Sequence, residues 1–280
     1  MTGPYDPRVT AIGGDLASIA LQGIVPAKTY QAPMLMQVSA AVVPIRAAPV
    51  GDAEQWDQLI FGEGFDLLAE IDGFGWGQAR RDGYVGYVAL DALSAPVLAP
   101  THRVSALRTY GFSEPSIKSA PIGLYSLNAL VTVEAREGRF VRAARAGWFV
   151  ESQLSPIGQF ETDPVAVAER FLGAPYQWGG RESLGLDCSG LVQQAFYACG
   201  LTCPRDTDMQ AAQIGTAIDG PELRRGDLVF WKGHVGLMQD DTRLLHANAH
   251  HMAVASEPLD GAILRIEAAG SGKPTAFRRP

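Results

Sequence analysis

The chain has 280 residues, of which 47% are hydrophobic and 19% charged, and its formal net charge is −7. This length suggests two or three domains, and the apolar fraction is large enough for each domain to bury a core. The negative charge argues against general affinity for nucleic acids or anionic membranes, because both attract basic surfaces. We therefore expect neither nucleic acid nor membrane as a partner.

Residues 1–34 read as an N-terminal extension. They contain no basic region followed by an apolar stretch, so no secretory signal is visible and a cytoplasmic protein is expected. The apolar-leaning run 11–49 is interrupted by Asp15, Lys28 and four prolines, which is not the pattern of a membrane span. Within this run, Asp15 is expected to cap a short helix over 15–22.

The region 35–155 is rich in short β-prone runs separated by Gly, Pro and Asp turns, which is typical of small β-barrels. A faint repeat at an offset of 62 residues places Gly86-Tyr-Val88 over Trp148-Phe-Val150. This aromatic–valine strand at the end of each unit resembles the bacterial SH3-like domains. The first unit, 35–98, resembles them more closely than the second, 99–155, through Leu59-Ile-Phe-Gly-Glu63 and Asp82-Gly-Tyr-Val-Gly-Tyr-Val88.

Residues 155–162 read as a linker to a C-terminal domain that we assign to 160–280. Its first element is a helix expected over 165–172. Asp163 supplies the N-cap, the proline after it suits the first helical position, and Gly173 ends the helix.

A loop with Gly179, Gly180 and Gly185 leads to Cys188, which begins a second helix. The apolar residues after it are spaced three and four apart and mark one buried stripe: Leu191, Val192, Ala195, Phe196 and Cys199. A thiol at a helix N-terminus meets unpaired N–H groups and the positive end of the helix dipole, so we expect a lowered pKa and a thiolate. The same N–H groups can hold an oxyanion. The alternative, a small buried hydrophobe, describes Cys199 better than Cys188.

Two histidines lie on a predicted hairpin. His234 opens an apolar run, His246 follows a second one, and Asp240-Asp241 between them reads as the turn. If the loop centres on the second aspartate, His246 lies opposite Gly236, and the two histidines become diagonal neighbours on one face. One ring can then orient the other for service as a base. The alternative is that either histidine is an ordinary surface or hydrogen-bonded residue.

A metal site formed by His246, His250 and His251 is the competing interpretation of the histidines. No acidic residue stands at a His-Glu-x-x-His spacing, and successive residues of a strand face opposite sides. We expect no metal and no organic cofactor.

Together these segments resemble the NlpC-type family of papain-like cysteine peptidases, bacterial enzymes that cut peptidoglycan stem peptides. The likeness covers about residues 160–275 and rests on motifs in the right order: Tyr-x-Trp-Gly-Gly, Asp-Cys-Ser-Gly-Leu-Val, Gly-Asp-Leu-Val-Phe-Trp and His-Val-Gly. It implies an α/β (α+β) fold in which a papain-like catalytic domain follows two small SH3-like β-barrels.

The resemblance also implies roles for single residues. Cys188 would be the nucleophile, His234 the general base and acid, and His246 the residue that orients His234. Tyr176 would lie beside the thiolate and help to shape the oxyanion site. Asp187 and Ser189 would contact the substrate.

In members of this family built in this order, an SH3-like domain closes one end of the cleft, and short peptides with a free N-terminal L-alanine are preferred. The resemblance makes Glu63 and Tyr84 candidate contacts to the substrate ammonium, together with Asp187, since a buried ammonium needs carboxylates around it. The alternative makes Glu63 a turn residue on a barrel rim and Tyr84 a core aromatic.

The activity implied is hydrolysis of the γ-D-glutamyl–L-diamino acid bond in short peptidoglycan-derived peptides, as in cytosolic muropeptide recycling. Two alternatives stay open: an exported hydrolase of intact peptidoglycan whose SH3-like units bind the wall, and an acyltransfer or other non-peptidase role of the same thiol. Cys199 and Cys203 either pair or stay reduced, and reduced thiols fit a cytosolic chain. The residues indicate neither the diamino acid nor an oligomeric state.

Overall fold

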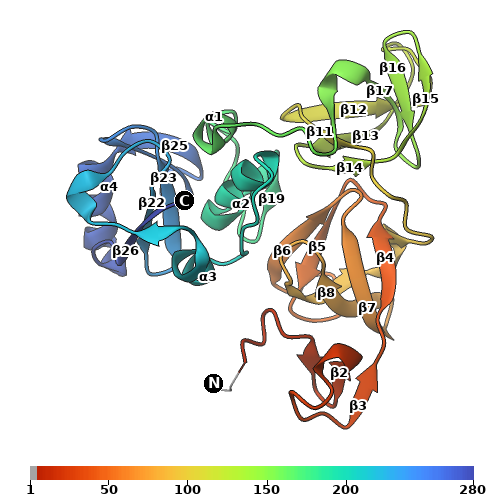
Figure 1. Cartoon of the computed structure of the whole chain (residues 1–280), viewed down its shortest axis with the longest axis horizontal. Coiled ribbons are helices and arrows are strands. Elements are labelled where there is room, and N and C mark those ends of the chain that lie inside the picture. The colour runs from red at the N-terminus through yellow and green to blue at the C-terminus, as the bar shows by residue number, and fades with distance from the viewer. Residues whose placement is uncertain (1–4) are drawn as a thin grey trace. The chain divides into compact units, whose positions relative to one another are not determined.

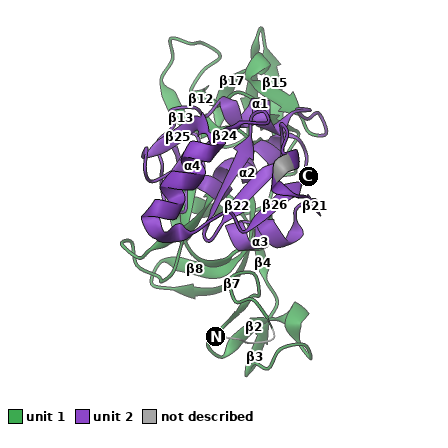
Figure 2. Ribbon diagram, turned by 90° about the vertical axis from the view of Figure 1, so that its left-hand side faces the viewer, with its two compact units in different colours: residues 1–157 green, residues 158–280 purple. Residues whose placement is uncertain are grey.

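The computed structural model describes residues 5–280, and the chain divides between Ile157 and Gly158 into two compact units. Figure 1 traces the elements in chain order, and Figure 2 colours unit 1 (1–157) and unit 2 (158–280) differently. Unit 1 consists of strands joined by turns and short 3-10 helices, whereas unit 2 combines strands with α-helices. Between residues 5 and 280 we find no helix with the long apolar run that crossing a bilayer requires.

Unit 1 begins with a small sheet of strand order β1-β2-β3. Its strands are Ile12–Gly13, Leu16–Ser18 and Thr29–Gln31, and a 3-10 helix, η1, covers Ile19–Leu21. The α-helix expected over 15–22 is therefore wrong. Asp15 forms an ion pair with Lys28 at 2.9 Å, and β2 pairs with both of its neighbours, so strand pairing overrides the local capping signal.

The first SH3-like module is an antiparallel sheet of strand order β10-β4-β7-β8-β9-β5-β6. Its strands are Met34–Val38 (β4), Val42–Arg46 (β5), Gln55–Ile60 (β6), Gly64–Ile71 (β7), Phe74–Ala79 (β8), Val85–Ala89 (β9) and Leu93–Ser94 (β10). The sheet wraps one core that includes Ile45, Leu59, Phe65 and Val88. Its edge strands β6 and β10 do not pair with each other in the described part of the chain, so the expected barrel is open. β10 has only two paired residues, too few to close the ring.

The second module contains two sheets instead of one closed barrel, with orders β13-β12-β17-β16-β15 and β14-β11-β18. Its strands are His102–Val104 (β11), Arg108–Phe112 (β12), Pro121–Ser126 (β13), Leu130–Val131 (β14), Val133–Glu137 (β15), Phe140–Ala143 (β16), Gly147–Val150 (β17) and Leu154–Pro156 (β18). The register shifts in β12 and β15, and such bulges bend strands and interrupt their pairing.

The faint sequence repeat has a structural counterpart. Each module ends with a strand, a 3-10 helix and a second strand. In the first module these are β9, η2 (Leu90–Ala92) and β10; in the second they are β17, η3 (Glu151–Gln153) and β18.

The two modules also share a core. Phe61, which directly follows β6, packs among the buried residues of the second module and meets the ring of Tyr125 edge-on at 5.1 Å between centroids. The N–H of Leu130 donates to the carbonyl of Phe61 at 2.8 Å. A Cβ at Gly62 would lie 2.0 Å from the carbonyl oxygen of Leu130, so only glycine permits this approach.

Unit 2 is built around an antiparallel sheet of strand order β21-β26-β22-β23-β24-β25. These strands are Thr216–Ala217 (β21), Leu228–Trp231 (β22), His234–Met238 (β23), Arg243–Asn248 (β24), Ala253–Pro258 (β25) and Ala276–Arg279 (β26). A short hairpin joins Arg181–Glu182 (β19) and Gly185–Leu186 (β20). The helices are Pro164–Glu169 (α1), Cys188–Ala198 (α2), Thr207–Gln213 (α3) and Leu259–Ile266 (α4), and one π-helical turn, Glu267–Ser271, follows α4.

The helices of unit 2 pack on this sheet. Every residue of α2 is buried, and the helix lies against β23 and β24. α4 contributes Leu259, Ala262 and Ile266 to a core with residues of β22, β23 and β24. Asp163 caps α1 as expected, accepting from the N–H of Val165 at 2.9 Å, although the helix ends at Glu169 and not at residue 172.

Candidate active site

A tight loop brings Cys188 to the first turn of α2. A Cβ at Gly180 would lie 2.5 Å from the carbonyl oxygen of Gly185, and one at Gly190 would lie 2.3 Å from that of Gly180. No side chain fits at either position. The glycines therefore let the loop backbone pack directly on the start of the helix.

Asp187 is the N-cap of α2 and the centre of a buried polar network. Its carboxylate accepts from the N–H of Gly190 at 2.8 Å and from that of Gly179 at 3.0 Å. Arg205 binds the same carboxylate with both terminal nitrogens, at 3.0 and 2.6 Å, and donates to Ser189 Oγ at 2.7 Å. Asp187 and Ser189 thus hold the start of the helix in place. Their contact with substrate stays a prediction.

Cys188 is 6% exposed. Burial, together with the neighbouring Asp187 carboxylate, raises the pKa of the Cys188 thiol to about 12. The backbone N–H groups of Val235 and Ser189 act in the opposite direction but are outweighed. The lowered pKa expected at a helix N-terminus is therefore wrong, because desolvation of the thiolate is the larger effect. The Cys188 thiol is therefore neutral at rest, and it would need a base to act as a nucleophile.

Tyr176 lies in the surroundings of this thiol. Burial raises the pKa of Tyr176, and the charges of Cys188 and Asp187 add to the effect because both groups are close. The Tyr176 backbone is fixed by its N–H, which donates to the carbonyl of Met252 at 2.9 Å. Its role in an oxyanion site stays a prediction.

His234 and His246 meet as the hairpin pattern predicts. β23 and β24 pair Leu237 with Leu245, which is the register of a loop centred on Asp241. His234 Nε2 lies 2.7 Å from His246 Nδ1, and the ring planes are inclined at 61°. The expected contact between the two rings is confirmed.

The thiol and the histidine pair come from elements that pack together. α2 lies against both β23 and β24. The Cys188 thiol accepts from the N–H of Val235, the residue directly after His234. The structure therefore brings Cys188, His234 and His246 into one region of unit 2.

Both histidines favour their neutral forms. Burial lowers the pKa of His234 to about 3, and the nearby His246 and Arg265 act in the same direction. Burial lowers the pKa of His246 to about 4, although the hydrogen bond that His246 donates to Glu257 acts in the opposite direction. Both rings line a pocket of about 410 Å³, which also takes in Lys232, Asn248 and Arg265. A neutral imidazole at a pocket wall keeps a lone pair free for a proton, although its lowered pKa makes it a weaker base than an exposed histidine.

Sequence reasoning missed Glu257 and Arg265, which extend the histidine pair. His246 Nε2 lies 2.8 Å from Glu257 Oε1, and Arg265 of α4 binds the same carboxylate oxygen. The signal for Glu257 was an acidic residue in the strand after β24, but its register depends on a loop that the local pattern does not specify. Arg205, the partner of Asp187, was missed because it lies between α2 and α3 in a segment without a distinctive pattern.

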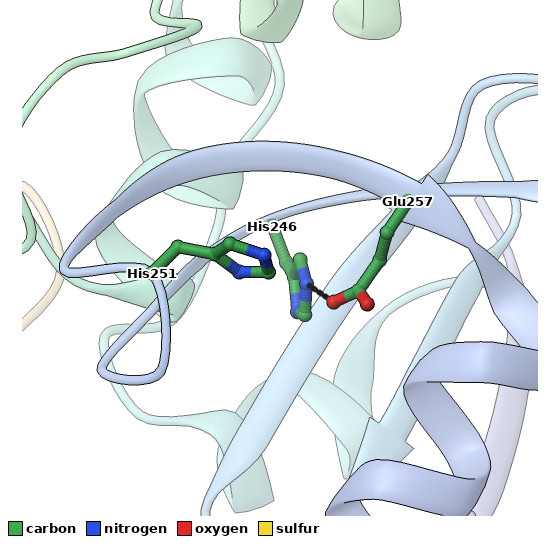
Figure 3. A group of neighbouring side chains, drawn as sticks. All are labelled: His246, His251 and Glu257. Carbon is green, nitrogen blue, oxygen red and sulfur yellow. Dashed lines mark hydrogen bonds and ion pairs between the residues drawn. The ribbon is translucent and has the colours of Figure 1, made fainter.

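His246, His251 and Glu257 bring their potential ligand atoms within 4.8 Å of one another (Figure 3). Both nitrogens of His246 already have partners, Nδ1 of His251 lies 2.9 Å from Asn248 Oδ1, and Glu257 binds Arg265. A cation in this group would have to displace Arg265 and break the histidine pair. The residues present therefore fit a hydrogen-bonded chain better than a metal centre.

Comparison with known proteins identifies two parts of the chain. Residues 173–267 match the NlpC/P60 family, and residues 45–93 match the bacterial dipeptidyl-peptidase Sh3 domain. This chain carries an NlpC/P60 domain. The domain contains Cys188, both histidines and Glu257, so the family resemblance inferred from the motifs is confirmed.

Curated relatives of the NlpC/P60 domain include two proteins named gamma-D-glutamyl-L-lysine dipeptidyl-peptidase. The Bacillus cereus protein is 33% identical over 41% of this chain and 36% of its own length, and the Bacillus subtilis protein is 31% identical over 60% and 62%. Dipeptidyl-peptidase 6 of Lysinibacillus sphaericus is 26% identical over 80% of this chain and 91% of its own. The chain thus spans about a third to nine tenths of these relatives.

The fold has a solved counterpart. An NlpC/P60 family protein from Bacillus cereus superposes with a TM-score of 0.74 over 88% of this chain and 99% of that one, at 18% identity. At this identity the likeness concerns the fold alone. It agrees with the expected order of SH3-like domain and NlpC/P60 domain.

The two residues that the resemblance singled out in the SH3-like region lie inside unit 1. Glu63 is 1% exposed, lies 2.8 Å from Arg81 and accepts from the N–H of Ile60 at 3.1 Å. Tyr84 belongs to the core of the first module. These contacts agree with the structural alternative for both residues, and a contact with substrate bound to the NlpC/P60 domain stays a prediction.

Proposed function

We propose that this protein is a cysteine endopeptidase that hydrolyses the amide between γ-D-glutamate and an L-diamino acid in peptidoglycan stem peptides. The observation that carries the proposal is the 2.7 Å contact between His234 and His246 beside the helix that begins at Cys188. A nucleophile at a helix N-terminus, a base and a group that orients the base are what acyl transfer from an amide requires. The choice of bond comes from two relatives, from Bacillus cereus and Bacillus subtilis, that are named gamma-D-glutamyl-L-lysine dipeptidyl-peptidase.

The neutral thiol and the neutral imidazole define the order of events. His234 takes the proton of Cys188 as the sulfur attacks the glutamyl carbonyl carbon, and backbone N–H groups at the start of α2 stabilise the oxyanion. His234 then gives that proton to the leaving amine as the C–N bond breaks, which leaves a thioester. Water loses a proton to His234 and attacks the thioester, and the thiol recovers its proton as the glutamyl acid departs.

We further propose that short peptides with a free N-terminal L-alanine are preferred. Three relatives carry dipeptidyl-peptidase in their names, a term for enzymes that release dipeptides from a free N-terminus. The match of residues 45–93 to a dipeptidyl-peptidase SH3 domain supports the same substrate class. Free stem peptides arise when peptidoglycan is degraded, so turnover of imported muropeptides in the cytoplasm is the setting that we propose. Fractionation of cells that express the chain with its native ends tests this location.

The decisive experiment uses defined peptides and mass spectrometry of the products. L-Ala-γ-D-Glu-diaminopimelate and its lysine counterpart are compared with the same peptides acetylated at the amine, and with intact peptidoglycan. We expect cleavage between glutamate and the diamino acid. Blocked peptides should be cut roughly 5- to 150-fold more slowly, since a buried carboxylate without its partner costs about 1–3 kcal/mol.

Two outcomes would redirect the proposal. Equal rates on free, blocked and wall-bound substrates would favour a wall hydrolase. Amide products formed with an added amine, in place of the free acid, would favour acyl transfer. Cys199→Ala is the matched control, because Cys199 is half-buried at the far end of α2 and should keep full activity.

A further inference from the structure

An unbroken line of hydrogen bonds continues behind His234 across three neighbouring strands. His234 on β23 meets His246 on β24 at 2.7 Å, and His246 meets Glu257 on β25 at 2.8 Å. Arg265 on α4 binds the outer end of this line at the Glu257 carboxylate. Figure 3 shows the His246 ring facing that carboxylate. Each member therefore comes from a different element of unit 2.

Strand register explains why Glu257 reaches His246. β24 and β25 pair Leu244 with Glu257 and His246 with Ala255. Side chains two residues apart on a strand share a face, so Glu257 and His246 are diagonal neighbours on the face that Leu244 turns to α4. A shift by one residue would turn Glu257 to the other side of the sheet.

The charge state of Glu257 determines which ring nitrogen carries the proton in each histidine. Burial alone would raise the pKa of Glu257, but Arg265 and His246 outweigh it, so the pKa is lowered and the group is a carboxylate at neutral pH. A carboxylate only accepts hydrogen bonds, so Nε2 of His246 must carry the proton. His246 is neutral because burial lowers its pKa to about 4, and its Nδ1 must then accept. His234 consequently donates from Nε2, and its lone pair stands on Nδ1.

We propose that Glu257, held by Arg265, is a positioning residue that fixes the tautomers of His246 and His234 and so keeps the lone pair of His234 on Nδ1 for the Cys188 proton. The inference rests on the proposed function and adds to it a residue that touches neither substrate nor thiol. When His234 becomes an imidazolium, its Nε2–H bond to His246 becomes charge-assisted, and the Glu257 carboxylate stabilises the positive charge through the intervening ring.

Removing the carboxylate releases this constraint. Without Glu257, His246 can carry its proton on Nδ1, where it would donate to Nε2 of His234. The proton of His234 would then move to Nδ1, and the base would lose the lone pair that the thiol needs. Glutamine at position 257 can present either its oxygen or its amide nitrogen, so it should allow both arrangements.

The first test reads the tautomers directly, without substrate. Proteins labelled with ¹⁵N in histidine are compared by long-range ¹H–¹⁵N NMR as wild type, Glu257→Ala and Glu257→Gln. We expect the wild type to carry protons on Nε2 of both rings, Glu257→Gln to show a mixture, and Glu257→Ala to lose the Nε2 preference. Asp260→Asn is the matched control, because Asp260 is an exposed carboxylate at the start of α4 outside the line. Unchanged tautomers in both folded Glu257 variants would overturn the proposal.

The second test is kinetic. Loss of a group that fixes a histidine tautomer costs on the order of 10- to 100-fold, and here it should lower kcat while KM stays the same. Glu257→Gln should fall between Glu257→Ala and wild type. An equal loss in both variants that tracks reduced thermal stability, with KM raised, would indicate a structural role only.

A double variant isolates the route through His246. In His246→Asn the amide oxygen stands close to the former Nδ1 position and can accept from His234 without help from Glu257. Glu257→Gln should therefore lower kcat when it is introduced into the wild type. It should cause no further loss when it is introduced into His246→Asn. Additive losses would contradict the relay. If no peptide is cleaved by any form while the tautomers still depend on Glu257, the proposed function fails and this inference stands.

Discussion

Arg205 Nη2 lies 2.6 Å from Asp187 Oδ2, and the two side chains are 1% and 9% exposed. This ion pair adjoins Cys188, the proposed nucleophile, since Asp187 caps the helix that Cys188 begins. The position of the thiol therefore depends on the charge of Arg205, which lies outside the Asp-Cys-Ser motif.

Arg205→Ala should lower the free energy of unfolding of unit 2 by about 3–5 kcal/mol, because it leaves the Asp187 carboxylate buried without its cation. Chemical denaturation followed by fluorescence measures the change. Arg225→Ala is the matched control: Arg225 pairs with Asp163 and Glu169 but is 40% exposed, and such pairs contribute less than about 1 kcal/mol. Equal losses in the two variants would contradict a special role for the buried pair.

The nucleophile is tested by substitution. Cys188→Ala should abolish peptide cleavage and leave the fold intact. His234→Ala should reduce kcat by on the order of 10⁴-fold or more, whereas His246→Ala should retain a measurable rate, since an orienting group costs less than the base. Product formation is followed by mass spectrometry, and circular dichroism checks the fold. Residual activity in His234→Ala above that in His246→Ala would reverse the two assignments.

Alkylation of Cys188 should be slow at neutral pH. With a thiol pKa raised to about 12, the thiolate fraction, and with it the rate with iodoacetamide, should rise steadily from pH 7 to pH 10 without a plateau. Peptide mapping separates Cys188 from Cys199 and Cys203. A plateau that begins below pH 7 would show a thiolate–imidazolium pair and would restore the expectation drawn from the helix N-terminus.

Acid should destabilise unit 2 through the histidine pair. The pKa values of His234 and His246 are lowered from 6.5 to about 3 and about 4, so the unfolded chain binds more protons than the folded one in this range. The free energy of unfolding should therefore fall as pH drops from 6.5 towards 4. Urea midpoints measured across this range should fall less steeply for His246→Asn than for wild type. The exposed His250, replaced by Asn, serves as the control and should leave the slope unchanged.

Glu63→Gln tests whether Glu63 has a structural role alone or also contacts the substrate ammonium. It should lower the stability of unit 1, because Arg81 loses its ionic partner at a buried site. The predicted substrate role requires in addition that the preference for a free amine over an acetylated one shrinks. Rates on the two peptides, measured for Glu63→Gln and for wild type, decide this. An unchanged ratio would leave Glu63 with a structural role alone.

The hairpin that carries His234 and His246 was predictable from the sequence because its register depends on local features. The turn at Asp241 and the alternation along two strands determine the register of Leu237 with Leu245, and the contact of His234 with His246 follows from it. The helix at Cys188 was equally visible from its glycine loop and apolar stripe.

Other features depend on contacts between distant segments, which local patterns do not specify. Glu257 is placed by a third strand, and Arg205 reaches Asp187 across a stretch without a distinctive pattern. The raised pKa of Cys188 reflects its burial, a property of the folded unit rather than of its helix. The same holds for Asp15, whose capping signal is overridden when β2 pairs with strands on both sides.

Phe61 belongs by sequence to the first SH3-like module and by packing to the second. Excising the first module would remove Ile60 and Phe61 from the core of the second module, and excising the second would expose both residues. Recombination, or a designed exchange of the first module for one of different specificity, must therefore transfer the Phe61-Gly62 segment together with its Tyr125 and Leu130 counterparts. Unit 1 should accordingly melt in a single cooperative transition and evolve as one piece.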